Sequence, residues 1–266
     1  MILYVRKWQN RLGNNLNQLV HILHIALHYN YNIILPVHQF INKRYLVINK
    51  NIKNKNNLIT AYKDFYKLQY VKRLPRGILN KNVNTVKTLM TDLFVYDSSI
   101  EFSGSDLIIH IRGGDIFKNT GSNKLYVTPP LSYYINIIEG NSYKRIIIVS
   151  EDRRNPCVDE LLNRYPNAEF TIQSFEKDIG IIMGAVNIVE SYGTLIPALC
   201  AISKNIKTIY RPSYQMTRSN KFLNNCIIKK TPLRSYYKKQ YPWRNRPRQR
   251  KYILTYGMPV EKTHKD

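Results

Sequence analysis

The sequence contains little cysteine: Cys157, Cys200 and Cys226 are the only three among 266 residues. They are too few and too scattered for a disulfide framework or a zinc site, so a reducing compartment is the natural expectation. Stability must then come from buried apolar side chains. A chain of this length holds one large or two small α/β domains, each with enough buried surface to fold without covalent staples.

A long apolar segment is also missing. No run of apolar residues approaches the roughly 20 that a membrane-spanning helix needs. Met1–Val5 is a short strand-like run followed directly by Arg6 and Lys7, unlike a secretory signal. These absences predict a soluble, cytoplasmic protein without a membrane span, or the soluble part of a longer, anchored one.

Acidic residues are absent from long stretches at both ends of the chain. The formal net charge is +24, and no Asp or Glu occurs before Asp64 or between Glu190 and Glu261. Surfaces this cationic attract anions, whether a nucleotide sugar, an acidic glycan, a membrane face or a nucleic acid. The abundance of Lys, Asn, Ile and Tyr is also typical of an AT-rich genome, which would produce part of this basicity without any partner.

What the sequence does contain is a regular alternation of apolar strands and helices, most evident after Glu101. Strands are expected at Leu107 to Ile111, Arg145 to Val149, Ala168 to Ile172, Ile188 to Glu190, Thr208 to Tyr210 and Cys226 to Ile228. Strands separated by helices predict a doubly wound parallel sheet. The first forty residues read as strand, glycine loop, helix from Leu16 to Tyr29, and strand, which opens a smaller Rossmann-like unit. We therefore predict an α/β fold of two Rossmann-like domains, 1–100 and 101–228, followed by a basic aromatic tail, 229–266.

The segment 106–115, DLIIHIRGGD, is the most informative in the chain. Its apolar part suits a central parallel strand, and Gly113 and Gly114 let the backbone turn sharply beside a ligand. A guanidinium grips phosphate with two parallel hydrogen bonds, so Arg112 next to these glycines predicts a clamp for the phosphates of a nucleotide sugar. The alternative is a structural pair between Arg112 and Asp115 that closes the loop.

Two further segments are expected to meet the same anion. One precedes an apolar helix with exposed first amides and forms a second phosphate cradle facing Arg112: Ser191, Tyr192, Gly193 and Thr194. Simple N-capping of that helix by Thr194 is the alternative. In the first domain, Gly13 and Asn14 lie in the glycine loop between strand and helix, where backbone amides can meet an anion or sugar, unless the glycine serves only a tight turn.

Four segments, in sequence order, resemble motifs of the α1,2-, α1,6- and protein O-fucosyltransferase superfamily. The segment 110–115, HIRGGD, resembles its His-x-Arg-x-Gly/Arg-Asp motif, and 11–18, RLGNNLNQ, resembles its opening glycine loop. The family's Tyr-Tyr helix and Ser-Asp-Asp strand end are similar to 131–138, LSYYINII, and 147–152, IIVSED. The segment 178–194 resembles the part in which an Asp at a helix start precedes a strand that ends in Ser-x-Ser-Ser/Thr.

The resemblance implies an inverting, metal-independent glycosyltransferase of GT-B-like architecture that moves L-fucose from GDP-fucose to a glycan hydroxyl. It also implies that Asp178 contacts the guanine, whose ring amine and amide are donors for a carboxylate, and that His110 touches the nucleoside. Asp152 follows a strand at its carboxyl end, the usual ligand rim of an α/β sheet. Read without the resemblance, Asp178 could be only the N-cap of the following helix. A related transferase that uses another nucleotide sugar is the alternative within this class.

The sequence itself agrees with a reaction that needs no metal. The sequence has no Asp-x-Asp pair, the spaced arrangement that holds a divalent ion on nucleotide sugars. Glu151 and Asp152 are adjacent and not spaced in this way. The chain departs from its relatives at the base that would activate the acceptor hydroxyl, since it has no carboxylate at the places where some members carry glutamate. Asp115 is the nearest candidate for a catalytic carboxylate, although it could orient Arg112 instead.

The tail from Lys229 to Lys251 alternates basic and aromatic side chains and includes 244–250, RNRPRQR. It could be a solvated arm that packs back on the first domain, or an arm that contacts an anionic surface or an acidic glycan. A structural strap across the two domains is favoured, because the Tyr and Trp side chains supply apolar area that an electrostatic arm would not need.

Two functions outside transferase chemistry stay open. Basic grooves with aromatic rings bind single-stranded nucleic acid, although the sequence shows no RNA-recognition aromatic signature, zinc spacing or recognition helix. A sugar-binding protein without catalysis is the other. Turnover of a nucleotide sugar separates both from a transferase.

Overall fold

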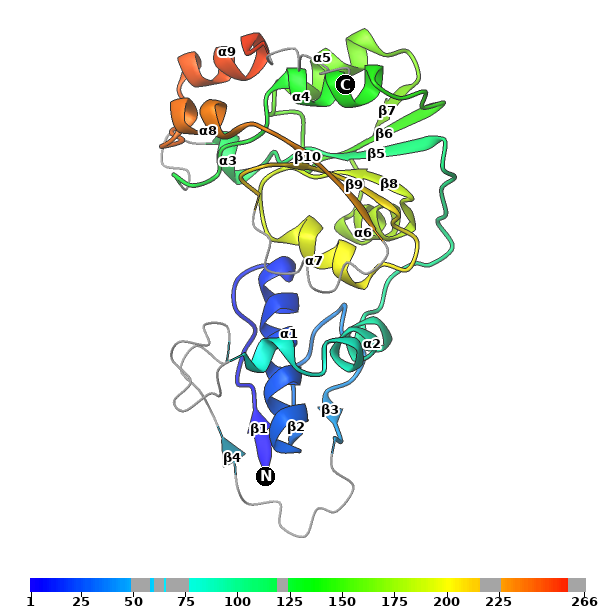
Figure 1. Ribbon diagram of the computed structural model, residues 1–266, viewed down its shortest axis with the longest axis vertical. Helices are drawn as coiled ribbons and strands as arrows, with labels where there is room; N and C mark the ends of the chain where they lie inside the picture. Colours follow the sequence, from blue (N-terminus) through cyan, green and yellow to red (C-terminus); the bar gives the residue numbers. More distant parts are fainter. Residues whose placement is uncertain (49–57, 60–64, 66–76, 119–123, 216–225, 258–266) are drawn as a thin grey trace, which may run out of the picture. The chain divides into compact units, whose positions relative to one another are not determined.

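The computed structural model describes residues 1–48, 58–59, 65, 77–118, 124–215 and 226–257, which form two compact units (Figure 1). The first unit takes its described residues from Met1–Asp97 and Thr194–Lys204, and the second from Ser98–Gly193, Asn205–Met216 and Asn225–Asp266. Among the described residues, no helix is both long enough and apolar enough to cross a membrane.

The first unit contains a four-stranded sheet in the order β3-β2-β1-β4. β1 (Ile2–Tyr4) is parallel to β2 (Asn32–Ile34) and to β4 (Leu58–Ile59), and β3 (Tyr45–Leu46) is antiparallel to β2. α1 (Leu12–Tyr29) buries apolar side chains at helical spacing and packs against α2 (Val83–Leu93) and α7 (Leu195–Ile202). A short 3-10 helix, η3 (Ile78–Asn80), also contacts α1.

The start of α1 differs from the sequence prediction. The helix begins at Leu12 instead of Leu16, so Gly13 lies in its first turn and not in a strand-to-helix turn. A Cβ atom on Gly13 would stand 2.6 Å from the backbone nitrogen of Leu195 at the start of α7. The glycine is therefore needed for the close approach of two helices.

The second unit is built on a six-stranded sheet in the order β10-β9-β8-β5-β6-β7, in which every neighbouring pair is parallel. The strands are β5 (Asp106–His110), β6 (Arg145–Val149), β7 (Ala168–Phe170), β8 (Asn187–Val189), β9 (Thr208–Pro212) and β10 (Ile227–Thr231). The central strands are apolar and buried, as strands covered on both faces must be.

Helices cover both faces of this sheet. Figure 1 shows α4 (Leu131–Glu139) and α5 (Cys157–Arg164) over one face and α6 (Phe175–Gly184) over the other. A single-turn helix, α3 (Asp115–Lys118), follows β5. The predicted α/β class is confirmed: each unit has a mainly parallel sheet, and the larger sheet is doubly wound. All six strands predicted for it are present, with ends that lie within three residues of the predicted ones: β7 ends at Phe170 instead of Ile172, and β10 ends at Thr231 instead of Ile228.

The basic aromatic segment contributes to the core of the second unit. After β10 it forms α8 (Arg234–Gln240) and α9 (Pro247–Thr255), and α9 packs on α4. The buried side chains Tyr236, Trp243 and Ile253 share one hydrophobic cluster with Leu107 of β5. The expectation of a solvated arm on the first domain is therefore wrong, because the described part of this segment packs into the second unit. The favoured strap across the two domains stays a prediction.

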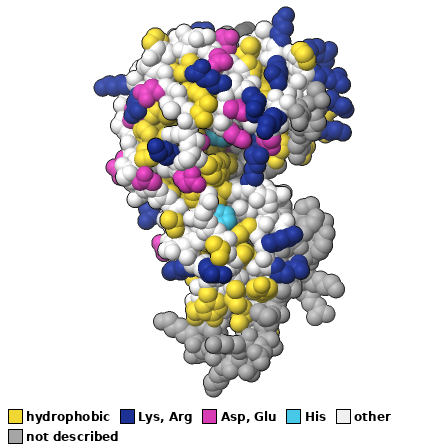
Figure 2. Space-filling view, turned by 180° about the vertical axis from the view of Figure 1, so that it is seen from behind, with side chains coloured by type: hydrophobic (Ala, Val, Ile, Leu, Met, Phe, Trp, Pro, Cys, Tyr) yellow, Lys and Arg dark blue, Asp and Glu magenta, His cyan; other side chains and the backbone are white. Residues whose placement is uncertain are grey.

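Charge is divided unevenly between the two units. Of the described residues in the first unit, only Asp92 and Asp97 are acidic. In the face shown in Figure 2, Asp and Glu side chains gather on the second unit, whereas Lys and Arg side chains occur on both. The first unit is therefore strongly cationic on its own.

Candidate functional site

The strand order of the second unit fixes where a ligand would bind. β5 and β8 are neighbours, but the chain winds from β5 toward β7 and from β8 toward β10, in opposite directions. The loops that leave their carboxyl ends therefore diverge, and this switch point is where open α/β sheets bind ligands. His110 is the last residue of β5 and residues 111–114 follow it, while residues 190–193 follow β8.

Arg112 projects from the first of these loops and is placed mainly by an aromatic ring. Its guanidinium carbon lies 3.9 Å from the centre of the Tyr126 ring, close enough for a cation–π contact. Its Nη2 is 3.4 Å from Oδ1 of Asp115, whose side chain is 46% exposed, so this ion pair is weak. The buried Nε of Arg112 has no hydrogen-bond partner among the described residues. The guanidinium is partly exposed and its Nη1 makes no hydrogen bond with the described residues, so it keeps donor capacity for a ligand.

The loop after β8 packs against the same guanidinium. Gly193 has a φ of 149°, which favours glycine, and a Cβ there would stand 2.9 Å from Nη1 of Arg112. The sequence predicted that Ser191, Tyr192, Gly193 and Thr194 face Arg112, and the structure brings Gly193 to it. Tyr192 packs edge-on against Tyr126, with ring centres 5.9 Å apart.

Gln215 holds this loop and was not found from the sequence. Its Oε1 accepts a hydrogen bond from the backbone nitrogen of Gly193 at 3.1 Å, and its Nε2 donates to the carbonyl oxygen of Ser191 at 2.5 Å. The Gln215 side chain is buried, so both of its polar ends are used inside the protein. A glutamine in a loop after β9 carries no sequence signal for such a role.

A buried ion pair lies directly before the same loop. Glu190, after β8, and Arg211, in β9, are both almost fully inaccessible, and Arg211 donates through Nη2 to Oε1 of Glu190 at 2.7 Å. A second hydrogen bond joins Arg211 Nε to Glu190 Oε2. Tyr133 donates to the Glu190 carbonyl oxygen at 3.3 Å. The pair therefore fixes the two strand ends that carry the loop.

Asp152 holds the glycine turn after β5. Its Oδ1 accepts from the backbone nitrogens of Gly114 at 3.2 Å and Arg154 at 3.0 Å, and its Oδ2 lies 2.6 Å from Nη1 of Arg154. Gly114 has a φ of 57°, and a Cβ on Gly113 would stand 2.7 Å from Asp152 Oδ1. The carboxylate predicted at the ligand rim is thus engaged with the turn that presents Arg112.

Asn155 is a second positioning residue that sequence reasoning missed. Its Nδ2 donates to the carbonyl oxygen of Arg112 at 3.0 Å, and its Oδ1 accepts from the backbone nitrogen of Cys157 at 3.1 Å. The side chain is fully buried, so the link between the Arg112 loop and the start of α5 is shielded from water.

His110 ends β5, where its imidazole is enclosed. Burial first, and the charge of Arg112 second, lower the pKa of His110 to about 3. The ring is therefore neutral at physiological pH, and its buried Nδ1 has no hydrogen-bond partner among the described residues. A neutral imidazole in this position suits hydrogen bonding to an uncharged group better than proton abstraction.

Asp178 lies in the first turn of α6, but it is not the N-cap. Ser174 caps this helix by accepting from the backbone nitrogen of Lys177 at 3.3 Å, so the N-cap interpretation of Asp178 is wrong. Oδ1 of Asp178 accepts from Nε2 of Gln173 at 2.9 Å. Burial raises the pKa of Asp178 to about 6, which the hydrogen bond from Gln173 partly opposes.

The site residues predicted at the helix starts of the first unit also meet. Thr194 occupies the N-cap position of α7, yet its hydroxyl donates to Oδ1 of Asn14 at 3.2 Å and makes no capping bond to its own helix. Gly13 packs beside them against Leu195. Simple N-capping by the Thr194 side chain is therefore wrong. Among the described residues, no three His, Cys, Asp or Glu side chains gather in a group that could hold a metal ion.

Comparisons with known proteins give similarity at the level of solved structures. No family model and no curated protein matches the sequence. Crystal structures of POFUT1 in complex with GDP align with 86% of this chain and 97% of theirs, at 10% identity and a TM-score of 0.44. A structure of NodZ alpha-1,6-fucosyltransferase soaked with GDP-fucose aligns with 85% of this chain and 93% of its own, at 10% identity and a TM-score of 0.39.

Proposed function

We propose that the chain is an inverting, metal-independent glycosyltransferase that moves L-fucose from GDP-fucose to a glycan hydroxyl. The observation that carries this proposal is the placement of Arg112. Its guanidinium stacks on Tyr126 at the switch point of a doubly wound sheet and stands against Gly193 of the neighbouring loop. A fixed planar cation with unused donor capacity is the group needed to hold a diphosphate.

In this reaction the acceptor oxygen forms a bond to the anomeric carbon while the bond from that carbon to the diphosphate breaks. The acceptor loses its proton, and the leaving GDP gains negative charge on its β-phosphate. Arg112 would stabilise that charge as it develops, with the backbone of Gly193 beside it. Asp152 and Asn155 would act through the Arg112 loop by keeping its backbone in place.

The nucleoside end of the donor is assigned to Asp178 and His110. An ionised Asp178 accepts from the ring N–H and the exocyclic amine of guanine, and neutral His110 can donate or accept beside the nucleoside. His110 ends β5, and Asp178 lies in the first turn of α6, which follows β7 of the same sheet. Gly13, Asn14 and Thr194 stay predicted donor-binding residues.

Asp115 is the carboxylate we assign to the acceptor proton. The Asp115 side chain is 46% exposed, against 21% for Asp152, and lies 3.4 Å from Arg112. An exposed carboxylate next to the reacting diphosphate can accept a proton from an incoming hydroxyl. The same distance also allows Asp115 to orient Arg112.

Isothermal titration with GDP and with GDP-fucose, in buffer containing EDTA, tests the donor assignment. We expect both to bind, UDP and ADP to bind more weakly, and fucose to be transferred to at least one member of a glycan panel. Undetectable binding of both guanine nucleotides would overturn the donor. Tight binding of another nucleotide sugar would keep the Arg112 clamp and change the base and the sugar.

A further inference from the structure

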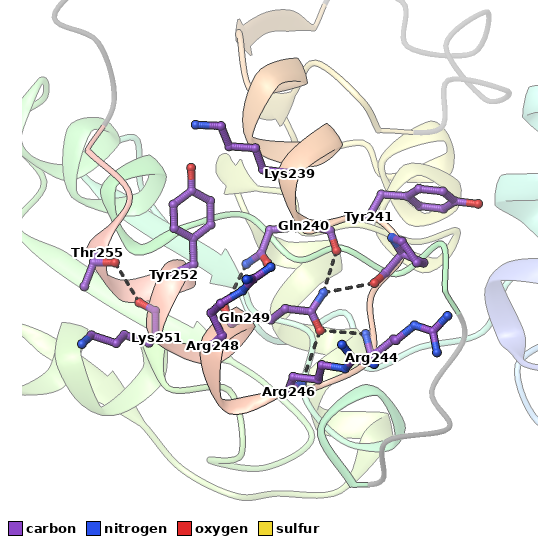
Figure 3. Close-up of a pocket in the computed structure, with 11 residues that line it drawn as sticks. Lys239, Gln240, Tyr241, Arg244, Arg246, Arg248, Gln249, Lys251, Tyr252 and Thr255 are labelled. Carbon is purple, nitrogen blue, oxygen red and sulfur yellow. Dashed lines mark hydrogen bonds between the residues drawn. The ribbon is translucent and has the colours of Figure 1, made fainter.

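α8, α9 and the loop between them line an open pocket of about 500 Å³ that the proposed reaction does not use. Five of its lining side chains are cationic: Lys239, Arg244, Arg246, Arg248 and Lys251. None of its lining residues is acidic, and Arg112 is not among them. Figure 3 shows these side chains arranged around Gln240, Gln249 and Tyr252, all within the second unit.

Two glutamines hold the pocket loop in one conformation. Nε2 of Gln249 donates to the carbonyl oxygens of Gln240 at 2.7 Å and Pro242 at 3.1 Å, and Gln240 donates back to the carbonyl oxygen of Gln249 at 2.9 Å. Oε1 of Gln249 accepts from the backbone nitrogens of Arg244 at 3.0 Å and Arg246 at 3.3 Å (Figure 3). These hydrogen bonds therefore hold the backbone that carries Arg244 and Arg246 in place.

The loop is also anchored to the core from within. Trp243 is fully buried and donates from its indole nitrogen to the carbonyl oxygen of Ile116 at 2.9 Å. Arg250 turns inward, where it donates to Oδ1 of Asn245 at 2.7 Å and to the carbonyl oxygen of Phe117 at 2.9 Å. The four arginines of this basic run thus divide into one structural residue, Arg250, and three exposed pocket residues, Arg244, Arg246 and Arg248.

The pocket cations differ from other arginines of the second unit in their surroundings. Several of those pair with carboxylates, as in Arg145–Glu169, Arg154–Asp152 and Arg164–Glu139. By contrast, no described carboxylate lies within ion-pairing distance of any of the five pocket cations. The fold therefore gathers like charges in a concavity, where their fields add.

We propose that this pocket binds a compact polyanion, a small ligand that carries several phosphate or sulfate groups. Guanidinium groups form paired hydrogen bonds with such oxyanions, and a concavity of this volume is in the range of small-ligand sites. A concave pocket fits a compact ligand better than it fits a flat membrane face. The inference does not depend on the proposed transferase activity.

The test is titration of inositol hexakisphosphate and of sucrose octasulfate at an ionic strength of about 0.15 M, which screens diffuse attraction between exposed charges. We compare the wild-type chain, the variant Arg244→Gln/Arg246→Gln/Arg248→Gln, and a matched control, Lys144→Gln/Lys207→Gln/Lys230→Gln. The control removes the same charge from exposed positions of the second unit outside the pocket. We expect one saturable site in the wild type and the control, and a loss of affinity of about tenfold or more in the pocket variant.

The two probes separate the sources of the anion. Tighter binding of the phosphate probe supports a phosphorylated small molecule, and tighter binding of the sulfate probe supports an acidic glycan. Equal losses in the two triple variants would overturn the proposal, because they would show attraction by net charge alone. Absence of saturable binding, or binding only to anionic vesicles or to oligonucleotides, would overturn it as well.

Two measurements keep the result interpretable. Arg244→Lys/Arg246→Lys/Arg248→Lys conserves charge, so weaker binding by this folded variant also supports recognition by guanidinium groups. GDP titrated into the glutamine pocket variant should bind as it does to the wild-type chain. Loss of GDP binding in that variant would place the anion site within the donor site and overturn its independence.

Discussion

At the scale of single residues, Arg112 is partly buried, and its loop is held by the buried side chain of Asn155. An ammonium cannot reproduce the guanidinium fork or its stacking on Tyr126, so Arg112→Lys should reduce turnover by a hundred- to a thousand-fold, or about 3–4 kcal/mol of transition-state stabilisation. Steady-state kinetics with GDP-fucose measures this effect. Arg145→Lys is the matched control, because Arg145 is an exposed arginine paired with Glu169 and should tolerate the change. Near-wild-type turnover by a folded Arg112→Lys protein would remove the residue from the mechanism.

Gly193 tests the same contact from the opposite side. A methyl group there would stand 2.9 Å from Nη1 of Arg112 and would also require an unfavourable φ of 149°. Gly193→Ala should therefore weaken GDP binding and lower the free energy of unfolding by about 1–3 kcal/mol. In Gly104→Ala the added carbon meets nothing within 4 Å, so both quantities should stay unchanged. Equal GDP affinity of the two variants would show that Gly193 does not help to place the clamp.

Asp178 gives the site a pH dependence with a definite sign. Its pKa is raised to about 6 from an ordinary value of 3.8, so the carboxylate that accepts from guanine forms only as pH rises through about 6. Guanosine affinity should increase over that interval and level off above it. The free energy of unfolding has the opposite pH dependence. The contribution of Asp178 to it decreases from about pH 4 to pH 6, because the folded state holds the proton more tightly than the unfolded state does.

Guanosine is the ligand for this measurement, because phosphate groups have an ionisation of their own near pH 6. His110 does not interfere, since its pKa is about 3. Asp178→Asn should bind guanosine weakly and without this pH dependence. A wild-type affinity that stays flat between pH 5 and pH 7 would exclude Asp178 from base recognition.

At the scale of secondary-structure elements, the ends of β8 and β9 are joined by the Glu190–Arg211 pair. Removing one partner leaves a buried charge without compensation, so Arg211→Ala should lower the free energy of unfolding by about 3–5 kcal/mol. Glu190→Leu/Arg211→Met removes both charges and should recover much of that loss. Urea denaturation of the three proteins checks this order. A single variant as stable as the wild type would show that the pair does not stabilise the sheet.

The central strands of the second unit could be predicted from the sequence because they are apolar runs of strand length bounded by polar segments, whereas α8 and α9 lie in a basic aromatic segment without such a pattern. Gly13 was misplaced because nothing in 11–15, RLGNN, marks the helix start with a capping side chain. Gln215 and Asn155 could not have been found, since the hydrogen bonds by which they hold the site join them to backbone atoms that lie more than twenty positions away in the sequence. Such contacts follow from the tertiary fold and leave no periodicity in the sequence.

At the scale of the whole molecule, the basic segment has two faces with different roles. Trp243 is fully buried against Phe117, so Trp243→Ala should lower the free energy of unfolding by about 3–5 kcal/mol. Arg248→Gln, five residues further on at an exposed position, should leave stability unchanged within about 0.5 kcal/mol. Denaturation midpoints compare them directly. A stable Trp243→Ala protein would mean that the second unit does not need this segment.

The described residues of the first unit come from two separated stretches of chain, and this has a consequence during synthesis. α1 packs on α7, and Asn14 bonds to Thr194, 180 positions later. At ribosomal rates of about 5–20 residues per second, this partner emerges roughly ten to forty seconds after α1. The part of α1 that packs on α7 stays exposed to water for that time. Most strands of the second unit's sheet have by then left the ribosome. We therefore expect this part of α1 to need shielding from water until α7 has emerged.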